Sequence, residues 1–233
     1  MLKLFLTLLS LVLITVGYGQ TVVVAENVDQ QEEIPDFGMN RKHYTHTFMG
    51  VMFVVGSPEH PGAEVIYGRS RALEFGYRYK RKLSETFSFG SEITGRRHAF
   101  HIKQSEAKSV PDTIIRDSEK LVFLEAGIGA YKRINFGQRG NYIGRFVDTG
   151  VYASWIFHTR HVLFYEEEDV RHRVRKTGMN YPANLSYGFI ARIGFNNLVL
   201  KGSYRLSGLF IESAGLPEFP RYTVGIEFGM HPI

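Results

Sequence analysis

Hydrophobic and polar residues alternate along most of this chain, from about residue 43 to residue 230. Segment 73–80 shows the pattern most clearly, because Leu73, Phe75, Tyr77 and Tyr79 alternate with Glu74, Gly76, Arg78 and Lys80. A period of two places successive side chains on opposite faces and predicts β-strands. The alternation predicts eight strands, at residues 43–55, 73–80, 87–96, 120–132, 147–157, 185–195, 198–206 and 222–230. The first strand and the stretch 158–183 are the least regular, so ten strands remain compatible with the pattern.

The segments between these strands alternate in length. Short connections lie at 82–86, at 134–144 and at the pair Asn196-Asn197, whereas the long polar ones lie at 56–70, 101–119, 158–183 and 208–220. Short turns at one end and long loops at the other are typical of outer-membrane barrels. The sequence therefore predicts an all-β fold, an eight-stranded antiparallel up-and-down transmembrane β-barrel, with both chain ends on the side of the short turns.

The two faces of the strands differ in a way that predicts which one is outside. Glycines such as Gly76, Gly90 and Gly225 fall repeatedly on the polar face, where small residues suit a narrow interior crowded by long charged side chains. A soluble lipocalin-like barrel would have the reverse orientation, with its apolar face inside. Aromatic residues near strand ends on the apolar face fit the membrane interface. These aromatics are Tyr79, Phe87, Trp155, Phe157 and Phe195.

The polar face carries nearly equal numbers of acids and bases. Buried charges persist only when they are paired and hydrogen-bonded, and an eight-stranded barrel is just wide enough for side chains to fill it. We therefore expect a plugged interior held by an ion-pair network, with a gated narrow pore or a ligand site as the alternatives. The network is predicted to contain the acids Glu74, Glu92, Glu125, Asp148 and Glu227 and the bases Arg78, Lys80, Arg96, Arg192, Lys201 and Arg205.

The first residues have the features of a secretory signal. Lys3 precedes an apolar run over residues 4–16, and Gly17 and Gly19 supply the small residues that a signal peptidase requires. We expect cleavage after residue 19, a polar periplasmic leader over 20–42 and the barrel over 43–233. An uncleaved anchor is the alternative, but the run is shorter than the ~18 residues of a membrane-spanning helix. The predicted location is the outer membrane of a Gram-negative cell.

The amino-acid composition argues against several classes of function. The chain has no cysteine, which excludes disulfides, thiolate metal sites and a cysteine nucleophile. The net charge of +5 is mild and no Lys/Arg-rich block stands out, so nucleic-acid binding is not expected. Aromatics make up 14% of the chain and glycine contributes 24 residues, a combination that suits a β-barrel.

No catalytic site is visible in the sequence. Some small outer-membrane barrels act on lipid A or phospholipid with a histidine beside a serine, but here no histidine is followed two residues later by serine. His98 and His101, and His158 and His161, fall at the outer ends of two strands without an obvious nucleophile. We expect no enzyme activity and no cofactor.

The run 166–176 carries four acids followed by four bases. Together with His158, His161 and His172, the carboxylates Glu166–Glu168 would suit a divalent cation. A solvated, self-paired loop explains the same residues more simply, so no metal is expected. The loop 158–183 is the longest outward connection and, with the leader 20–42, the candidate surface for a partner.

The pattern resembles the small outer-membrane β-barrel families of Bacteroidota, labelled porin-family or PorT-like. The segment Ala130–Phe136 and the final strand Tyr222–Phe228 carry the resemblance, whereas the chain ends in His231-Pro232-Ile233 rather than in an aromatic residue. Some members of these families support protein secretion. The resemblance implies a structural or interaction component of the envelope, an accessory to secretion. The alternatives are a narrow small-solute channel and a lipid-modifying enzyme.

Overall fold

Each alternating segment forms a strand, and several strands extend further than the pattern predicted. The computed structural model describes residues 38–137, 140–167 and 170–230. In this part of the chain the strands are β1 (His43–Val55), β2 (Arg71–Lys82), β3 (Phe87–Ile102), β4 (Ser118–Phe136), β5 (Arg145–Glu167), β6 (Val170–Thr177), β7 (Leu185–Phe195), β8 (Leu198–Arg205) and β9 (Tyr222–Met230). One short 3₁₀ helix, η1 (Glu212–Ala214), lies between β8 and β9. Among the described residues, no helix is long and apolar enough to cross a membrane.

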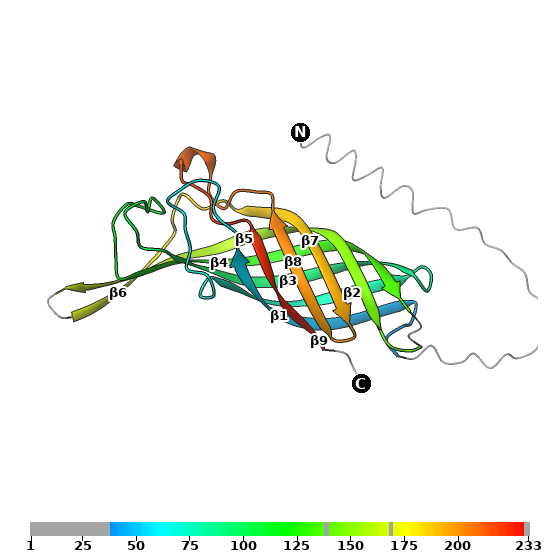
Figure 1. Cartoon of the computed structure of the whole chain (residues 1–233). Helices are drawn as coiled ribbons and strands as arrows, with labels where there is room; N and C mark the ends of the chain where they lie inside the picture. Colours follow the sequence, from blue (N-terminus) through cyan, green and yellow to red (C-terminus); the bar gives the residue numbers. More distant parts are fainter. Residues whose placement is uncertain (1–37, 138–139, 168–169, 231–233) are drawn as a thin grey trace, which may run out of the picture. The chain divides into compact units, whose positions relative to one another are not determined.

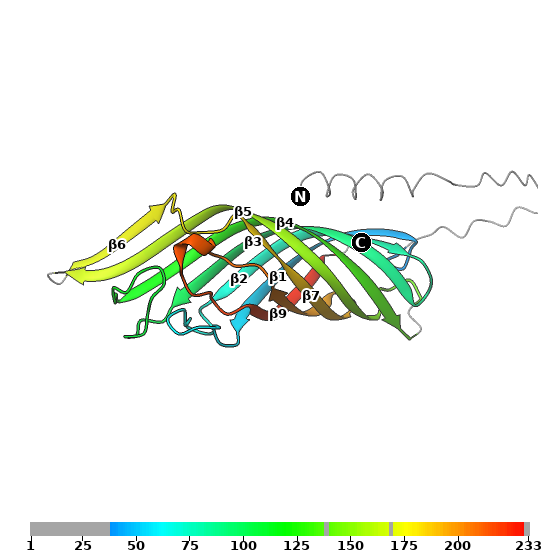
Figure 2. The same cartoon turned by 90° about the horizontal axis from the view of Figure 1, so that it is seen from above.

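The strands close into a ring. Within the described residues, consecutive neighbours pair antiparallel in the order β1, β2, β3, β4, β5, β7, β8 and β9 (Figures 1 and 2). β9 then pairs back with β1, from Thr47 opposite Met230 to Val55 opposite Tyr222. The ring leaves none of its eight strands as an open edge over the length of the barrel, which satisfies the backbone hydrogen bonds from within. The predicted eight-stranded antiparallel barrel is confirmed.

β6 lies outside this ring. Among the residues that the structure describes, it pairs only with the outer part of β5, from Arg160 opposite Thr177 to Glu167 opposite Val170. The β5–β6 hairpin projects beyond the other strands at the end of the long loops (Figure 1). The interpretation of 158–183 as one long loop is therefore wrong for most of its length, because only 178–184 connects β6 to β7 without regular structure.

The opposite end of the barrel carries the tight turns. Residues 83–86 join β2 to β3, and Asn196-Asn197 joins β7 to β8. Asn196 adopts a left-handed conformation with φ of 51°, which asparagine tolerates better than most residues. We refer to this side as the turn end and to the other as the loop end.

The N-terminal side of the barrel begins where the sequence predicted, since β1 starts at His43. Residues 38–42 precede it at the turn end, where the backbone N–H groups of Met39 and Asn40 donate to the carbonyl oxygen of Asn141 at 2.7 and 3.1 Å. The predicted signal segment 1–19 and the leader residues 20–37 lie outside the described residues.

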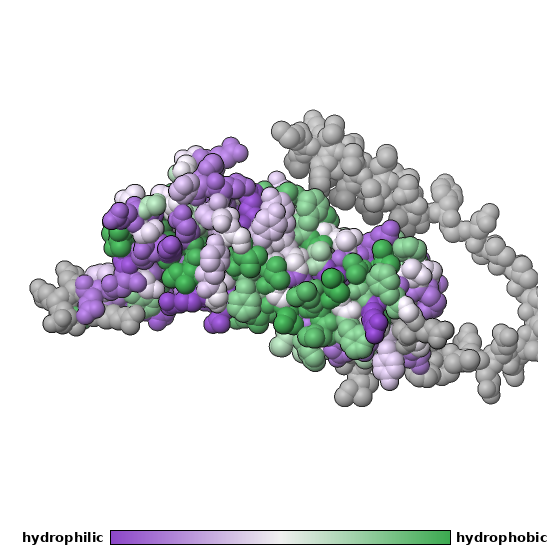
Figure 3. All heavy atoms as spheres, in the orientation of Figure 1, coloured by the Kyte–Doolittle hydropathy of each residue, from purple (hydrophilic) through white to green (hydrophobic). Residues whose placement is uncertain are grey.

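The outward face of the ring is apolar. In β7 the side chains alternate strictly between exposed and buried, and the exposed ones are Leu185, Tyr187, Phe189, Ala191, Ile193 and Phe195. Similar exposed apolar side chains occur on the other ring strands, among them Phe75, Ile128, Val151 and Leu200. On the face shown in Figure 3, hydrophobic residues gather over the strands and hydrophilic residues over the loop end. We call this surface the apolar belt.

Candidate functional site

The barrel interior contains the eleven charged residues that the alternation assigned to it. Ten of them are at most 7% exposed, and the side chain of Arg96 is 10% exposed. They come from β2, β3, β4, β5, β7, β8 and β9, so the charges converge from almost every side of the ring.

The centre of the network is built around Arg78 on β2. Its Nε donates to Glu92, which stands opposite it on β3, and its Nη2 donates to Glu227 on β9, both at 2.9 Å. Arg192 reaches the same Glu92 from β7, at 2.5 Å. Because β7 lies on another side of the ring, this guanidinium bridges the interior and ties distant strands together.

A second group of pairs continues the network toward the loop end. Arg96 contacts Glu74 at 2.6 Å and Glu125 at 3.3 Å, its direct neighbours on β2 and β4 in the sheet register. Lys201 joins Glu74 to Glu227, at 2.5 and 2.9 Å. Several acids therefore contact more than one cation, which offsets the cost of removing them from water.

Arg133 is the interior cation that the sequence interpretation missed. It is 1% exposed and its guanidinium contacts Asp148 at 2.7 Å and the ring of Phe146 at 3.5 Å from the centroid. It continues the inward series of Glu125 and Tyr131 on β4, so the alternation would have found it had the strand been extended past residue 132. Tyr131 is buried beside it, and its hydroxyl donates to the carbonyl oxygen of Tyr79.

Two of the predicted network residues lie at its margins. Lys80 donates to the carbonyl oxygen of Met39 at the turn end. At the loop end Arg205 pairs with Glu218, at 2.8 Å, and donates to the carbonyl oxygen of Phe219. The ion pairs therefore extend from the barrel wall to the segments at its loop end.

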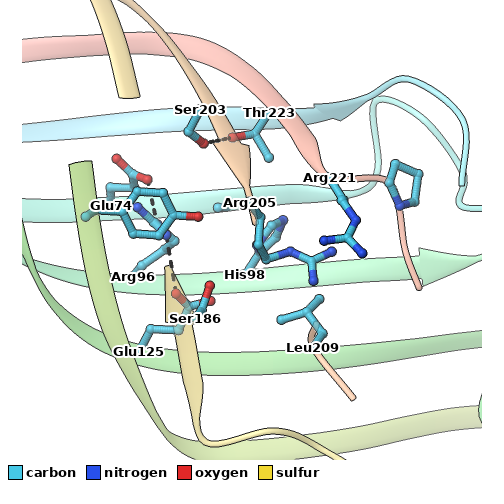
Figure 4. Close-up of a pocket in the computed structure, with 13 residues that line it drawn as sticks. Glu74, Arg96, His98, Glu125, Ser186, Ser203, Arg205, Leu209, Arg221 and Thr223 are labelled. Carbon is cyan, nitrogen blue, oxygen red and sulfur yellow. Dashed lines mark hydrogen bonds and ion pairs between the residues drawn. The ribbon is translucent and has the colours of Figure 1, made fainter. Parts of the chain in front are cut away.

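Little space remains inside. A cavity of about 20 Å³ lies beside Glu74, Arg96, His98, Ser203 and Arg205 (Figure 4). That volume holds about one water molecule. In Figure 4 Arg96 lies between Glu74 and Glu125, while the hydroxyl groups of Ser203 and Thr223 are hydrogen-bonded to each other at 2.6 Å.

Apolar clusters lie on both sides of the network. At the loop end, strand residues such as Phe100 and Phe123 pack with Leu209, Phe210 and Phe219 from the β8–β9 loop. Phe100 and Phe219 stack with ring centroids 4.6 Å apart. At the turn end, the cluster contains Tyr44, Ile143, Phe146 and Val199, with Met39 against it. The charged layer is thus enclosed between two apolar layers.

A separate charged cluster holds the β3–β4 loop in place. Glu119 is 1% exposed and contacts Lys108, Arg116 and His161, with the His161 Nε2 atom at 2.6 Å. Arg116 also forms an ion pair with Asp112 at 2.8 Å. The hydrogen bonds from Arg116 lower the pKa of the Asp112 carboxyl group. His161 is therefore an interior partner of Glu119. Among the described residues, no group of His, Asp and Glu is arranged to hold a metal ion.

The predicted interface aromatics lie on the outward face. Phe87, Trp155, Phe157 and Phe195 are exposed, with Phe87 and Phe195 toward the turn end and Trp155 and Phe157 toward the loop end. Tyr79 is half-buried, and its hydroxyl is hydrogen-bonded to His43 at 2.7 Å.

A closed ring with an apolar belt outside and paired charges inside reverses the arrangement of a soluble barrel. The fold is that of a transmembrane β-barrel of the outer-membrane type.

Comparisons with known proteins do not assign this chain to a family. No family model and no curated protein matches the chain. Among solved structures the chain is similar to Ail, the attachment invasion locus protein of Yersinia pestis, in complex with the heparin analogue sucrose octasulfate. The identity is 12%, the match covers 79% of this chain and 94% of that chain, and the TM-score is 0.34. At this level of similarity, no property of Ail is transferred to this chain.

Proposed function

We propose that the protein is a non-enzymatic component of the outer membrane, which binds another envelope protein through the β5–β6 hairpin and acts as an accessory to protein secretion. The observation that carries this proposal is the contrast between a closed interior and a projecting strand edge. Inside, two apolar layers enclose a paired network around a cavity of about 20 Å³. Outside, β6 pairs only with β5 among the described residues, so its other edge is open.

An open strand edge is suited to binding an extended peptide. Its unpaired N–H and C=O groups accept a further strand by β-augmentation, with adjacent side chains supplying specificity. β6 has the sequence VRHRVRKT, in which Arg173, Arg175 and Lys176 are exposed. The proposed partner segment is therefore extended and acidic.

A barrel with a shortened β5–β6 hairpin tests this function. Leu163 and Val174 are direct neighbours in the register, so residues 164–173 can be replaced by an Asn-Gly turn between them. We expect the full-length barrel, purified from membranes in mild detergent, to retain a protein partner that the shortened barrel loses. The matched control replaces Glu212–Ala214, which lies in another loop-end connection, by Gly-Ser-Gly and should retain the partner. Recovery of the full-length barrel alone, in repeated preparations, would count against the proposal.

The same geometry disfavours a channel, because a solute path requires connected space through both apolar layers. We propose no catalytic activity either. Overexpression of the protein should leave the lipid A and phospholipid profiles of the cell unchanged, whereas a new lipid species would support the lipid-modifying alternative.

A further inference from the structure

Exposed cations border the apolar belt on one side of the loop end. On β3, Arg97 is exposed and stands directly between Leu73 of β2 and Leu124 of β4 in the sheet register. Arg71 is also exposed and follows outward from Leu73 on the same face of β2, because residues two apart share a face. These guanidinium groups therefore lie at the level where the belt ends.

The cations continue along the sheet onto the projecting hairpin. Lys120 on β4 is opposite Val162 of β5, which in turn is opposite Arg175 of β6. Lys120 lies within electrostatic range of Arg69, Arg97, Arg173 and Arg175. Arg173 lies over the ring of Phe164, 5.4 Å from its centroid. We call Arg69, Arg71, Arg97, Lys120, Arg173 and Arg175 the outer cation patch.

Among the described residues, the cations of the outer cation patch are not paired with acids in the way that the interior cations are. None of its six members forms an ion pair with an acid among residues 38–137, 140–166 and 170–230. Where β8, β9 and β1 pair at the loop end, the residues in register with one another are instead Tyr204, Tyr222 and Val55. Six like charges on one side repel one another, so an anion with several negative groups would relieve the repulsion.

We propose that the outer cation patch binds the phosphate groups of a phosphorylated lipid in the surrounding outer leaflet. The position of the patch favours a lipid over a soluble anion. Arg97 is flanked by belt residues on both neighbouring strands, so a lipid whose acyl chains pack against the belt brings its headgroup to the cations. Cations beside a membrane surface attract anionic lipids, and arginine contacts phosphate through paired N–H groups.

The test compares two variants with equal loss of charge. In R97Q/R175Q both substitutions fall within the outer cation patch. In K103Q/K176Q one exposed cation lies in the β3–β4 loop, and the other lies on β6 opposite His161, which places it on the other face of the hairpin from Arg175. Each protein is reconstituted in phosphatidylcholine nanodiscs that contain a small fraction of lipid A. After extraction in mild detergent, the lipid A retained per barrel is measured by mass spectrometry.

We expect the native barrel and K103Q/K176Q to retain lipid A, and R97Q/R175Q to retain roughly tenfold less at low salt, since each membrane-facing cation contributes to headgroup affinity. R97K/R175K should retain most of the lipid A that the native barrel retains. None of the barrels should retain dephosphorylated lipid A. Each barrel must migrate as a folded species on an unheated gel, which separates a binding defect from misfolding.

Three results would overturn the proposal. Equal retention of lipid A by R97Q/R175Q and K103Q/K176Q would show that the outer cation patch does not bind lipid A. Equal retention of dephosphorylated lipid A would show that acyl chains alone are recognised. Displacement of lipid A by inorganic phosphate or by a soluble sulfated oligosaccharide at equal concentration would identify a soluble anion as the ligand.

Discussion

Arg133 on β4 and Asp148 on β5 face each other directly in the sheet, and two hydrogen bonds join their side chains. The bond from Nε to Oδ1 measures 2.7 Å and the bond from Nη2 to Oδ2 measures 2.9 Å. Such a paired contact is among the strongest that ionised side chains form. It fastens two neighbouring strands inside the barrel, where Asp148 has no exposure to solvent.

The buried pair predicts a large cost for removing one charge. Asp148→Asn takes away the carboxylate that pairs with the Arg133 guanidinium in a site closed to water, and it removes a third, more distant carboxylate from Arg192, which keeps its contacts with Glu92 and Glu227. We expect the free energy of unfolding, measured with urea in detergent micelles, to fall by about 3–5 kcal/mol. Asp117→Asn, at an exposed position, should change it by no more than about 0.5 kcal/mol. Equal effects of the two substitutions would show that the pair does not stabilise the barrel.

A glycine on the inward face predicts a steric effect. A Cβ atom at Gly225 would overlap the carbonyl oxygen of Val51 on the neighbouring strand, which is backbone and has little freedom to move. Gly225→Ala should therefore destabilise the barrel by about 1–3 kcal/mol. Gly202→Ala is the matched control, because nothing lies within 4 Å of the added atom. Thermal unfolding of both variants checks the difference, and a tolerated Gly225→Ala would contradict it.

The contacts of Glu119 predict that the β3–β4 loop depends on one carboxylate. Glu119→Gln weakens the contacts with Lys108, Arg116 and His161 together. We expect limited proteolysis to cleave the loop 103–117 at least several times faster while the ring strands stay protected. Glu106→Gln, on the same loop and exposed, should digest like the native protein. Unchanged protection in Glu119→Gln would mean that other contacts hold the loop.

The closed interior predicts that the barrel does not conduct ions. Planar-bilayer recordings of the refolded protein should show no stepwise current. Phe219→Ala loosens only the loop-end cluster, so this variant should also stay silent because the charged network and the turn-end cluster remain. Discrete conductance steps in the native protein would favour the narrow-channel alternative.

A single irregularity explains why the projecting hairpin was not foreseen. On β5 the register with β4 shifts between His158 opposite Leu124 and Ile156 opposite Glu125, which leaves Phe157 as an extra residue. Such a bulge moves the alternation by one position. The pattern that ran through Trp155 and Phe157 therefore breaks off, and the continuation of the strand to Glu167 looked like a loop.

The sequence by itself determined which face each strand turns inward, because a period of two in polarity is a local property that survives in any pairing of the strands. It thereby determined that Glu74, Arg78 and the other predicted network residues lie together in the barrel interior. Only the tertiary structure decided that β9 returns to β1, that Arg192 reaches Glu92, and that Phe219 stacks on Phe100. These contacts join residues far apart in the chain, and their geometry depends on ring closure, strand register and loop packing. The pairing of β3, β4, β5 and β6 also placed Arg97 and Arg175 in one outward patch, although these two residues are far apart in the sequence.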